Sequence, residues 1–290
     1  MFSAYLIHLL ILIGIYLILS LSLQIALGFS GLLNLGHIAF YCIGAYISAL
    51  LALAGWPWWL CFIAAGFLAM VFGFLLSLPT NKLKGDYLAL ATLGFSFVVY
   101  AVALNWIGLT RGPLGLPGIP KPEILGISFS SNASFLILTS LICLGVYLLL
   151  KKITSSPFGK AMQATRDDEL AVRVLGKNTF KIKTISLMIS AFFAGLAGSL
   201  YASYITFIDP SSFTLMQLIP IACIVIIGGL ASLKGTVIAC IILVLLPEPL
   251  RFIGFPSSII GPMRQIIYAL LLLLILIYRP KGFYGQVELE

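Results

Sequence analysis

The sequence contains very little charge. Asp, Glu, Lys and Arg make up 9% of its 290 residues, whereas 61% are hydrophobic; a soluble globular domain is about 25% charged. Its apolar runs are close to the roughly 20 residues that cross a bilayer core as a helix. The composition therefore excludes an ordinary soluble domain. The short alternating segments of a transmembrane β-barrel are also missing, so we expect a helical membrane protein.

The sequence also lacks recognisable catalytic patterns. It has no G-x-x-x-x-G-K-[ST] phosphate loop, no H-E-x-x-H, no G-x-S-x-G and no paired catalytic carboxylates. The five cysteines all lie in apolar runs without metal-ligand spacing, as small core residues do. We therefore expect neither an enzyme nor a metal or cofactor site, and we expect that the chain alone does not hydrolyse ATP.

No Asp, Glu, Lys or Arg lies in the middle of any apolar run between residues 3 and 152. An ion-coupled transporter usually needs such groups within the membrane, so their absence argues against a secondary transporter, although sodium coupling through neutral oxygens stays open. Asp86, Asp209 and Glu248 lie near segment ends, and we interpret them as interfacial charges. If the protein moves a solute uphill, the energy comes from outside this chain.

The apolar runs predict an all-α fold, a polytopic transmembrane helical bundle forming a single domain over residues 1–290. About nine segments fit the lengths, with eight or ten as alternatives. The runs cover residues 3–27, 37–54, 58–79, 87–106, 133–152, 184–207, 214–231, 235–249 and 264–279. Within the sixth run, "SAFFAGLAGSLYAS" places small residues on one helix face, which favours close helix packing.

Basic residues set the expected orientation. The net charge is +8, and eight of the 17 Lys and Arg residues fall in 151–183. Cytoplasmic loops carry the excess of Lys and Arg in membrane proteins, so we interpret this charge as a topology signal and not as nucleic-acid binding. Further basic residues in the 80–86 loop and near the C-terminus agree, namely Lys82, Lys84, Arg279 and Lys281. We expect the loop 153–183 and the C-terminus in the cytoplasm, with Met1 and residues 107–132 outside.

The charged stretch "SSPFGKAMQATRDDELAVRVLGKN", residues 155–178, predicts one or two short helices under the membrane. Ser156 and Pro157 suit a helix start, and Gly176 suits an end. Thr165 followed by Asp168 resembles a capping box, which would put three acids in a helical first turn. On a helical wheel one apolar face, interrupted by Asp168, gathers Phe158, Ala161, Met162, Thr165, Val172 and Leu175, and Leu170 and Val174 lie opposite. Two apolar faces indicate a helix covered from both sides, whereas a solvated loop that only fixes topology is the alternative.

Two Gly-rich stretches interrupt the apolar pattern, "GFSGLLNLGH" at 28–37 and "IGGLASLKG" at 227–235. Gly in a helix interior costs about 1 kcal/mol relative to Ala. Broken backbone at membrane depth is tolerated where protein or a watery cavity satisfies it. Paired breaks in two halves of a chain point to a transport pathway built from an internal repeat; two ordinary loops with Gly caps are the alternative.

Six stretches in order resemble the permeases of branched-chain amino acid ABC importers. They are "GLLNLGHIAFYCIGAY", "YLALATLGFSFVVYAVALNW", "LTRGPLGLPGIP", "SPFGKAMQATRDDELAVRVLGKN", "SAFFAGLAGSLYA" and "GGLASLKGTVIACIILVLLPE". The likeness is greater to the leucine/isoleucine/valine permease with the Gly/Pro-rich external motif, the partner of a shorter homologous permease. Urea and short-amide permeases share most of these stretches. One departure is that Gly176 follows Glu169-Leu170-Ala171 one position later than the general importer loop pattern.

The resemblance implies a bacterial inner-membrane protein with several partners: a second permease, two cytoplasmic ATPases, a periplasmic binding protein and the lipid bilayer. It implies no cofactor and no nucleic acid. The charged stretch would then insert into a groove on the ATPase, and Met162 with Arg166 to Glu169 would be central to that contact. The residues that we expect to couple to the ATPase are Phe158, Gly159, Lys160, Met162, Arg166, Asp167, Asp168 and Glu169.

Branched-chain amino acids are zwitterions with apolar side chains, and a pathway for them needs dipoles for the charged ends and apolar walls for the rest. The free N–H and C=O groups of broken helices supply such dipoles. Our candidates for the pathway are Asn34, Gly36, His37, Thr92 and Gly94. Structural roles are the alternatives, since Asn34 can cap the following helix and Thr92 can bond to its own helix. The sequence leaves leucine, isoleucine, valine, other amino acids and urea open as substrates. The Gly/Pro-rich external motif predicts a rigid turn-rich loop, as a gate or as a docking surface for the binding protein.

Overall fold

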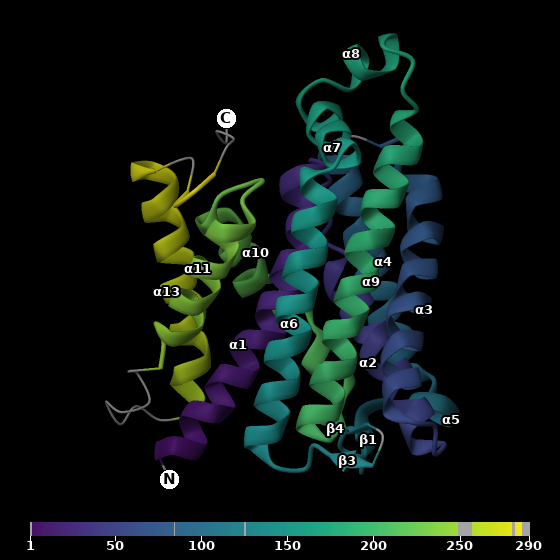
Figure 1. The fold of residues 1–290 in the computed structure, drawn as a ribbon, viewed down its shortest axis with the longest axis vertical. Coiled ribbons are helices and arrows are strands. Elements are labelled where there is room, and N and C mark those ends of the chain that lie inside the picture. Colours follow the sequence, from purple (N-terminus) through teal and green to yellow (C-terminus); the bar gives the residue numbers. More distant parts are fainter. Residues whose placement is uncertain (1, 84, 125, 249–256, 280–281, 286–290) are drawn as a thin grey trace.

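The computed structural model describes residues 2–83, 85–124, 126–248, 257–279 and 282–285. Met1, Lys84 and Lys281, on which the orientation prediction also drew, lie outside the described residues. Long helices run side by side (Figure 1). They are α1 (Phe2–Gln24), α2 (His37–Leu53), α3 (Trp58–Thr80), α4 (Asp86–Asn105), α6 (Asn132–Ser155), α9 (Thr179–Ile205), α10 (Leu218–Gly228), α11 (Leu233–Leu245) and α13 (Ser257–Tyr278).

Among the described residues, five helices are long and apolar enough to cross a membrane: Ala4–Phe29, Trp58–Thr80, Asp86–Asn105, Asn132–Ser155 and Thr179–Ile205. Shorter apolar helices cover His37–Leu53, Leu215–Gly228, Leu233–Leu245 and Gly261–Ile275. The polytopic helical bundle is therefore confirmed. The number of segments that cross the membrane stays a prediction, because the shorter helices alone do not reach the roughly 20 residues of a full crossing.

Short strands, which the expected all-α fold class did not include, form at one end of the molecule. There β1 (Leu116–Pro117) pairs antiparallel with β4 (Phe207–Ile208), and β2 (Glu123–Ile124) pairs with β3 (Ile127–Ser128). These strands lie beside α5 (Ile107–Thr110) (Figure 1). Gly115 has a φ of +68°, and a Cβ there would lie 2.5 Å from the carbonyl oxygen of Ile208. The Gly/Pro-rich motif therefore forms a turn-rich loop that is held against the end of α9.

Small residues bring α9 close to α2 and α3. A Cβ on Gly44 of α2 would lie 2.3 Å from the Gly195 carbonyl oxygen, and one on Gly198 of α9 would lie 2.2 Å from that of Tyr41. Ala191 and Ala194 on the same face of α9 are fully buried. The prediction that this face serves close helix packing is confirmed.

The chain leaves helical geometry at several places inside the bundle. After α1 the helix widens into the π-helical turn η1 (Ile25–Phe29), and residues 31–34 are extended or irregular before α2. Two short 3-10 turns, η3 (Pro210–Phe213) and η4 (Leu215–Gln217), separate β4 from α10. The turn at 229–232 separates α10 from α11.

The group of α10, α11 and α13 lies on the α1 side of the bundle, away from α3 (Figure 1).

Candidate functional site: a helix pair, two adjoining breaks and a polar cavity

The charged stretch forms two helices, α7 (Pro157–Asp167) and α8 (Glu169–Val174), which project from one end of the bundle (Figure 1). The Ser156 side chain accepts a hydrogen bond from the backbone N–H of Gly159 at 3.3 Å, and Pro157 occupies the first helical position. The predicted helix start is therefore confirmed. A Cβ on Gly159 would lie 2.1 Å from the Thr154 carbonyl oxygen, so glycine permits the sharp turn from α6 into α7.

The predicted capping box at Thr165 was wrong. Thr165 lies inside α7, where its hydroxyl donates to the Ala161 carbonyl oxygen at 2.7 Å. Asp168 is the residue that begins a helix: its Oδ1 accepts from the backbone N–H groups of Leu170 and Ala171 at 2.9 and 3.0 Å. Asp168 has extended backbone angles, which suit an N-cap. The three acids thus occupy a helix end, a cap and a first turn. Helix α8 ends at Val174, and Gly176 follows it with a φ of +75°, so the predicted end of the helix at this glycine is confirmed.

Glu169 fastens α8 to α9. Its carboxylate accepts from Lys183 Nζ at 2.6 Å and from the Thr179 hydroxyl at 3.1 Å, and it is paired with Arg173. Burial works against the charged form of this carboxyl, but Lys183, Arg173 and Thr179 outweigh it, so the pKa of Glu169 lies below its usual 4.5. Because the pKa of Glu169 is lowered, the stability that its ionised carboxylate contributes is fully present above the usual pKa. This stability is lost as the pH falls through the lowered pKa.

The structure corrects the expected contact surface of the helix pair. Met162 is fully buried within this chain and Gly159 is also buried, so neither is open to a partner protein. Leu175 is 77% exposed instead of sharing the buried face. The reason is that the chain leaves helical geometry at Asp168 and begins a new helix, α8, after it. The side chains of α8 therefore do not continue the faces of α7. The exposed residues of the helix pair include Lys160, Asp167, Asp168, Leu170, Arg173, Val174 and Leu175, whereas Phe158, Arg166 and Glu169 are half-buried.

Arg166 connects α7 to the first Gly-rich break. Its Nη1 donates to the Gly28 carbonyl oxygen at 2.6 Å, and Nη2 lies 2.8 Å from a carboxylate oxygen of Asp167. Gly31 has a φ of +66°, and a Cβ there would lie 2.6 Å from Arg166 Cγ. The break therefore depends on glycine at the point where the arginine crosses it.

The two Gly-rich breaks adjoin each other. Gln24 Nε2 donates to the Gly229 carbonyl oxygen at 2.8 Å, and a Cβ on Gly28 would lie 2.8 Å from the backbone nitrogen of Ala231. Gly229 and Ala231 both have positive φ, +97° and +61°. The C-terminal segment covers the second break, since the Phe283 N–H donates to the Ile227 carbonyl oxygen at 2.9 Å. Whether the two breaks descend from a repeat stays a prediction.

Helix α4 holds the first break through Thr92 and Ser96. Thr92 Oγ1 accepts from the Leu35 N–H at 3.0 Å and donates to the Ala89 carbonyl oxygen at 2.9 Å, and Ser96 donates to the Leu35 carbonyl oxygen at 3.0 Å. Thr92 thus bonds to its own helix and to the break. The Asn34 side chain is buried, and its amide has no hydrogen-bond partner among the described residues. Asn34 does not cap α2, because Gly36 occupies that position.

His37 and Gly94 lie apart from this arrangement. The His37 ring is fully buried, with Nε2 2.9 Å from the Ser22 hydroxyl and 3.1 Å from the Leu19 carbonyl oxygen. His37 therefore ties the start of α2 to α1 inside the core. Gly94 is on the exposed side of α4, where a Cβ would meet nothing within 4 Å. Of the pathway candidates, the structure brings together Asn34, Gly36 and Thr92.

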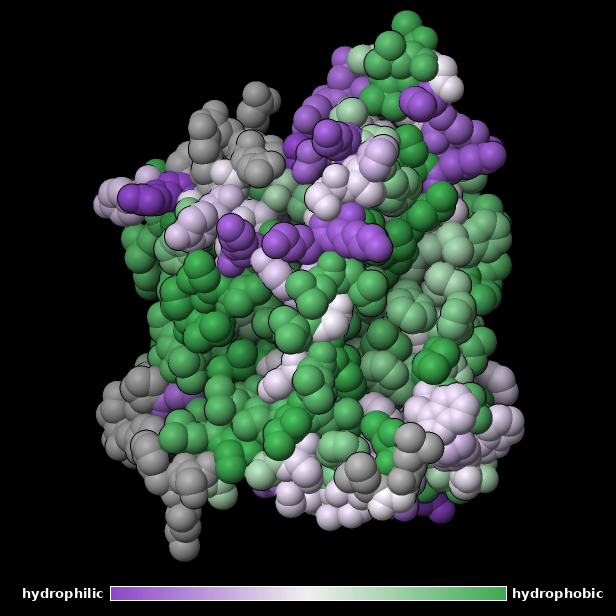
Figure 2. All heavy atoms as spheres, viewed as in Figure 1, coloured by the Kyte–Doolittle hydropathy of each residue, from purple (hydrophilic) through white to green (hydrophobic). Residues whose placement is uncertain are grey.

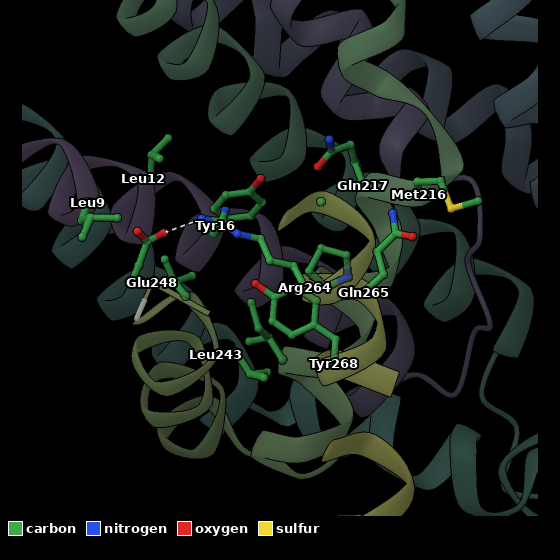
Figure 3. A pocket seen from close by; sticks show the side chains of 14 residues that line it. Leu9, Leu12, Tyr16, Met216, Gln217, Leu243, Glu248, Arg264, Gln265 and Tyr268 are labelled. Carbon is green, nitrogen blue, oxygen red and sulfur yellow. Dashed lines mark hydrogen bonds and ion pairs between the residues drawn. The ribbon is translucent and has the colours of Figure 1, made fainter. Parts of the chain in front are cut away.

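A cavity of about 300 Å³ lies among α1, α10, α11 and α13 (Figure 3). Arg264 Nη2 lies 3.0 Å from a carboxylate oxygen of Glu248, which also accepts from the Tyr5 hydroxyl. The remaining wall combines amides and hydroxyls with apolar groups, including Gln217, Gln265, Tyr16, Tyr268, Leu9, Leu12, Ile224 and Leu243. The ion pair is neutral as a whole, so it presents a dipole to the cavity instead of a net charge.

Sequence reasoning missed this cavity. It treated Glu248 as an interfacial charge, although Glu248 ends the last of the six family-like stretches, and it gave Arg264 no role because Arg264 belongs to none of them. A usable signal was present: opposite charges stand at the end of one apolar run and at the start of the next. Two such runs that pack side by side bring these charges together, and charged groups near the membrane interior pair with one another.

A bundle of apolar helices with adjoining breaks, a cavity of mixed polar and apolar lining and a projecting helix pair indicates a membrane transport component. Residues 5–276 match the family model for the permease component of branched-chain amino acid transport systems, and the chain belongs to that family. The resemblance seen in the sequence is therefore confirmed. The protein is one component of a transport system and not an enzyme.

Named relatives agree with this assignment. The chain is 38% identical to the high-affinity branched-chain amino acid permease LivM of Escherichia coli K12, over 92% of this chain and 67% of LivM. It is 26% identical to a probable LivM of Methanocaldococcus jannaschii, over 94% and 91% of the two chains. Identity to LivH of Escherichia coli K12 is 25%, over 95% and 92%. No solved structure matches the chain.

Proposed function

We propose that the chain is the membrane-spanning permease subunit of an ATP-driven importer in a bacterial inner membrane. It passes branched-chain amino acids that a periplasmic binding protein delivers. The observation that carries this proposal is the helix pair α7–α8, which exposes charged and apolar side chains outward and is tied by Arg166 to a break inside the bundle. The chain has no phosphate loop, which fits ATP hydrolysis by two partner ATPases. Likeness to both LivM and LivH supports a second, homologous permease as a partner.

Coupling would run from α8 and α7 into the breaks. When the ATPases close, they would push on the outward-facing side chains of α8, and Arg166 would carry the movement to Gly28. Gln24, the last residue of α1, packs against Gly28 of the first break and donates to Gly229 in the second. The two breaks would therefore move together, and the helices that follow them, α2 and α11, would shift relative to the rest of the bundle.

The polar cavity suits the chemistry of a branched-chain amino acid. A zwitterion needs opposed dipoles at its charged ends, which the neutral Glu248–Arg264 pair and the amides of Gln217 and Gln265 supply (Figure 3). Leu12, Ile224 and Leu243 would contact its apolar side chain. Because the ion pair neutralises itself, it would hold a passing substrate weakly, as a transport pathway requires. Asn34, whose amide lies in the first break and has no hydrogen-bond partner in the described part of the chain, would serve the other end of the pathway.

Uptake by the reconstituted complex tests the proposed function. We expect ATP-dependent accumulation of radiolabelled leucine that requires the binding protein and is inhibited by isoleucine and valine. Urea and acetamide in the same competitor panel address the short-amide alternative. Competition by urea but not by valine would contradict the proposed substrate, and uptake that follows a sodium gradient without ATP would contradict the transporter class.

Orientation is tested by cysteine labelling. The five native cysteines are buried, so introduced cysteines report with little background. Thr165 is buried and unsuitable, whereas Lys177 is exposed at the helix-pair end and Leu114 is 79% exposed at the opposite end. We expect an impermeant maleimide to label Leu114→Cys in intact cells and Lys177→Cys only after permeabilisation. The proposed orientation places the helix pair and the C-terminus in the cytoplasm and the N-terminus outside. The reverse labelling pattern would overturn it.

A further inference from the structure

A second, larger hollow runs along the outer surface of the bundle. Both α6 and α11 pack against α1, and together they leave an apolar groove of about 680 Å³. Leu10, Gly14 and Leu17 of α1 line it, together with Leu136, Cys143 and Leu144 of α6 and Val237 and Ile238 of α11. In Figure 2 this face is largely hydrophobic, and hydrophilic side chains cross it near the end that carries the helix pair.

Basic residues gather at that end of the groove. Lys234, the second residue of α11, lines it and is exposed. Tyr147 lines it from α6, and the exposed Lys151 follows one helical turn later on the same face. No Asp or Glu is among the described residues that line the groove. The groove is therefore apolar along its length and positively charged at one end.

We propose that this groove binds an anionic phospholipid, with one acyl chain between α6 and α11 and the phosphate beside Lys234. Basic pockets between membrane helices bind anionic lipid head groups in this way. The side chains at the rim decide between a lipid and a helix of another subunit. Close helix association in membranes relies on small residues, whereas Leu10, Leu144 and Ile238 at this rim are large and exposed. Such a rim suits a flexible acyl chain.

Native mass spectrometry of the purified full-length chain in detergent, titrated with phosphatidylglycerol or phosphatidylethanolamine, tests this site. We expect wild-type protein to retain phosphatidylglycerol in preference to phosphatidylethanolamine. Lys234→Glu should weaken phosphatidylglycerol binding by about fivefold or more, because it removes and reverses the charge at the phosphate. Lys234→Arg should keep the binding. Lys177→Glu makes the same charge change at an exposed site outside the groove and should have no effect.

A groove-filling variant gives an independent reading. Val237→Trp occupies the acyl chain's space and should lower the binding of phosphatidylglycerol while Lys234 is intact. Equal retention of both lipids by the wild type, or unchanged phosphatidylglycerol binding in both Lys234→Glu and Val237→Trp, would overturn the proposal. If Lys234→Glu released the second permease from the assembled complex and left lipid binding unchanged, the groove would belong to that subunit and the lipid assignment would be wrong.

Discussion

Uptake by the assembled importer should fall about tenfold or more in Arg166→Ala, while the ATPase subunits still co-purify. The variant removes the hydrogen bond from Arg166 to the Gly28 carbonyl oxygen and the packing of the arginine against Gly31. A hydrogen bond from a charged group contributes about 1.5–3 kcal/mol, which corresponds to about tenfold or more in an equilibrium constant. The outward surface of α8 is unchanged, so the loss should fall on coupling and not on assembly.

Two measurements separate coupling from assembly in Arg166→Ala. ATP hydrolysis by the complex should continue but should no longer respond to the loaded binding protein. Lys177→Ala, which removes an exposed positive charge just beyond α8, is the matched control and should retain uptake. Arg166→Lys keeps a donor near Gly28 and should restore part of the transport. Wild-type uptake in Arg166→Ala would show that α7 does not act through the first break.

The double variant Leu170→Asp with Val174→Asp should release the ATPases. These side chains are 65% and 87% exposed, and neither serves the fold of this chain. A partner that covers them gains from apolar burial, at roughly 25 cal/mol per Å² of buried area, and two carboxylates in the contact would oppose that burial. We expect ATPase co-purification to drop about tenfold or more and uptake to be lost, with membrane insertion unchanged.

The control for this variant is Leu114→Asp at the opposite end of the bundle. Leu114 is 79% exposed, so the chemical change is the same at a similar exposure. Co-purification of the ATPases should be retained there. If the α8 double variant assembled and transported normally, the helix pair would serve only to fix topology, which is the alternative that the charged sequence left open.

Local patterns predicted much of the helix pair. Ser156 with Pro157 and the glycine at 176 are short-range signals, because capping and helix termination depend on neighbouring residues, and both were found as expected. The error at Thr165 arose because threonine and aspartate both cap helices, and the sequence alone did not show which of them stands at a break. The Asp168 cap then changed which side chains share a face, and Leu175 moved to the exposed side.

By itself, the sequence determined the class of protein and the helical architecture, because hydrophobic length and the lack of charge act without regard to tertiary contacts. The family followed from the resemblance of six stretches in order, which the family match confirmed. Only the tertiary structure decided which polar residues meet. Glu248 and Arg264 come together although they belong to two separate apolar runs, Arg166 reaches Gly28 across 138 positions, and His37 lies in the core, whereas the Asn34 amide has no hydrogen-bond partner among the described residues. Such contacts depend on how separate helices pack, and no local pattern in the chain specifies them.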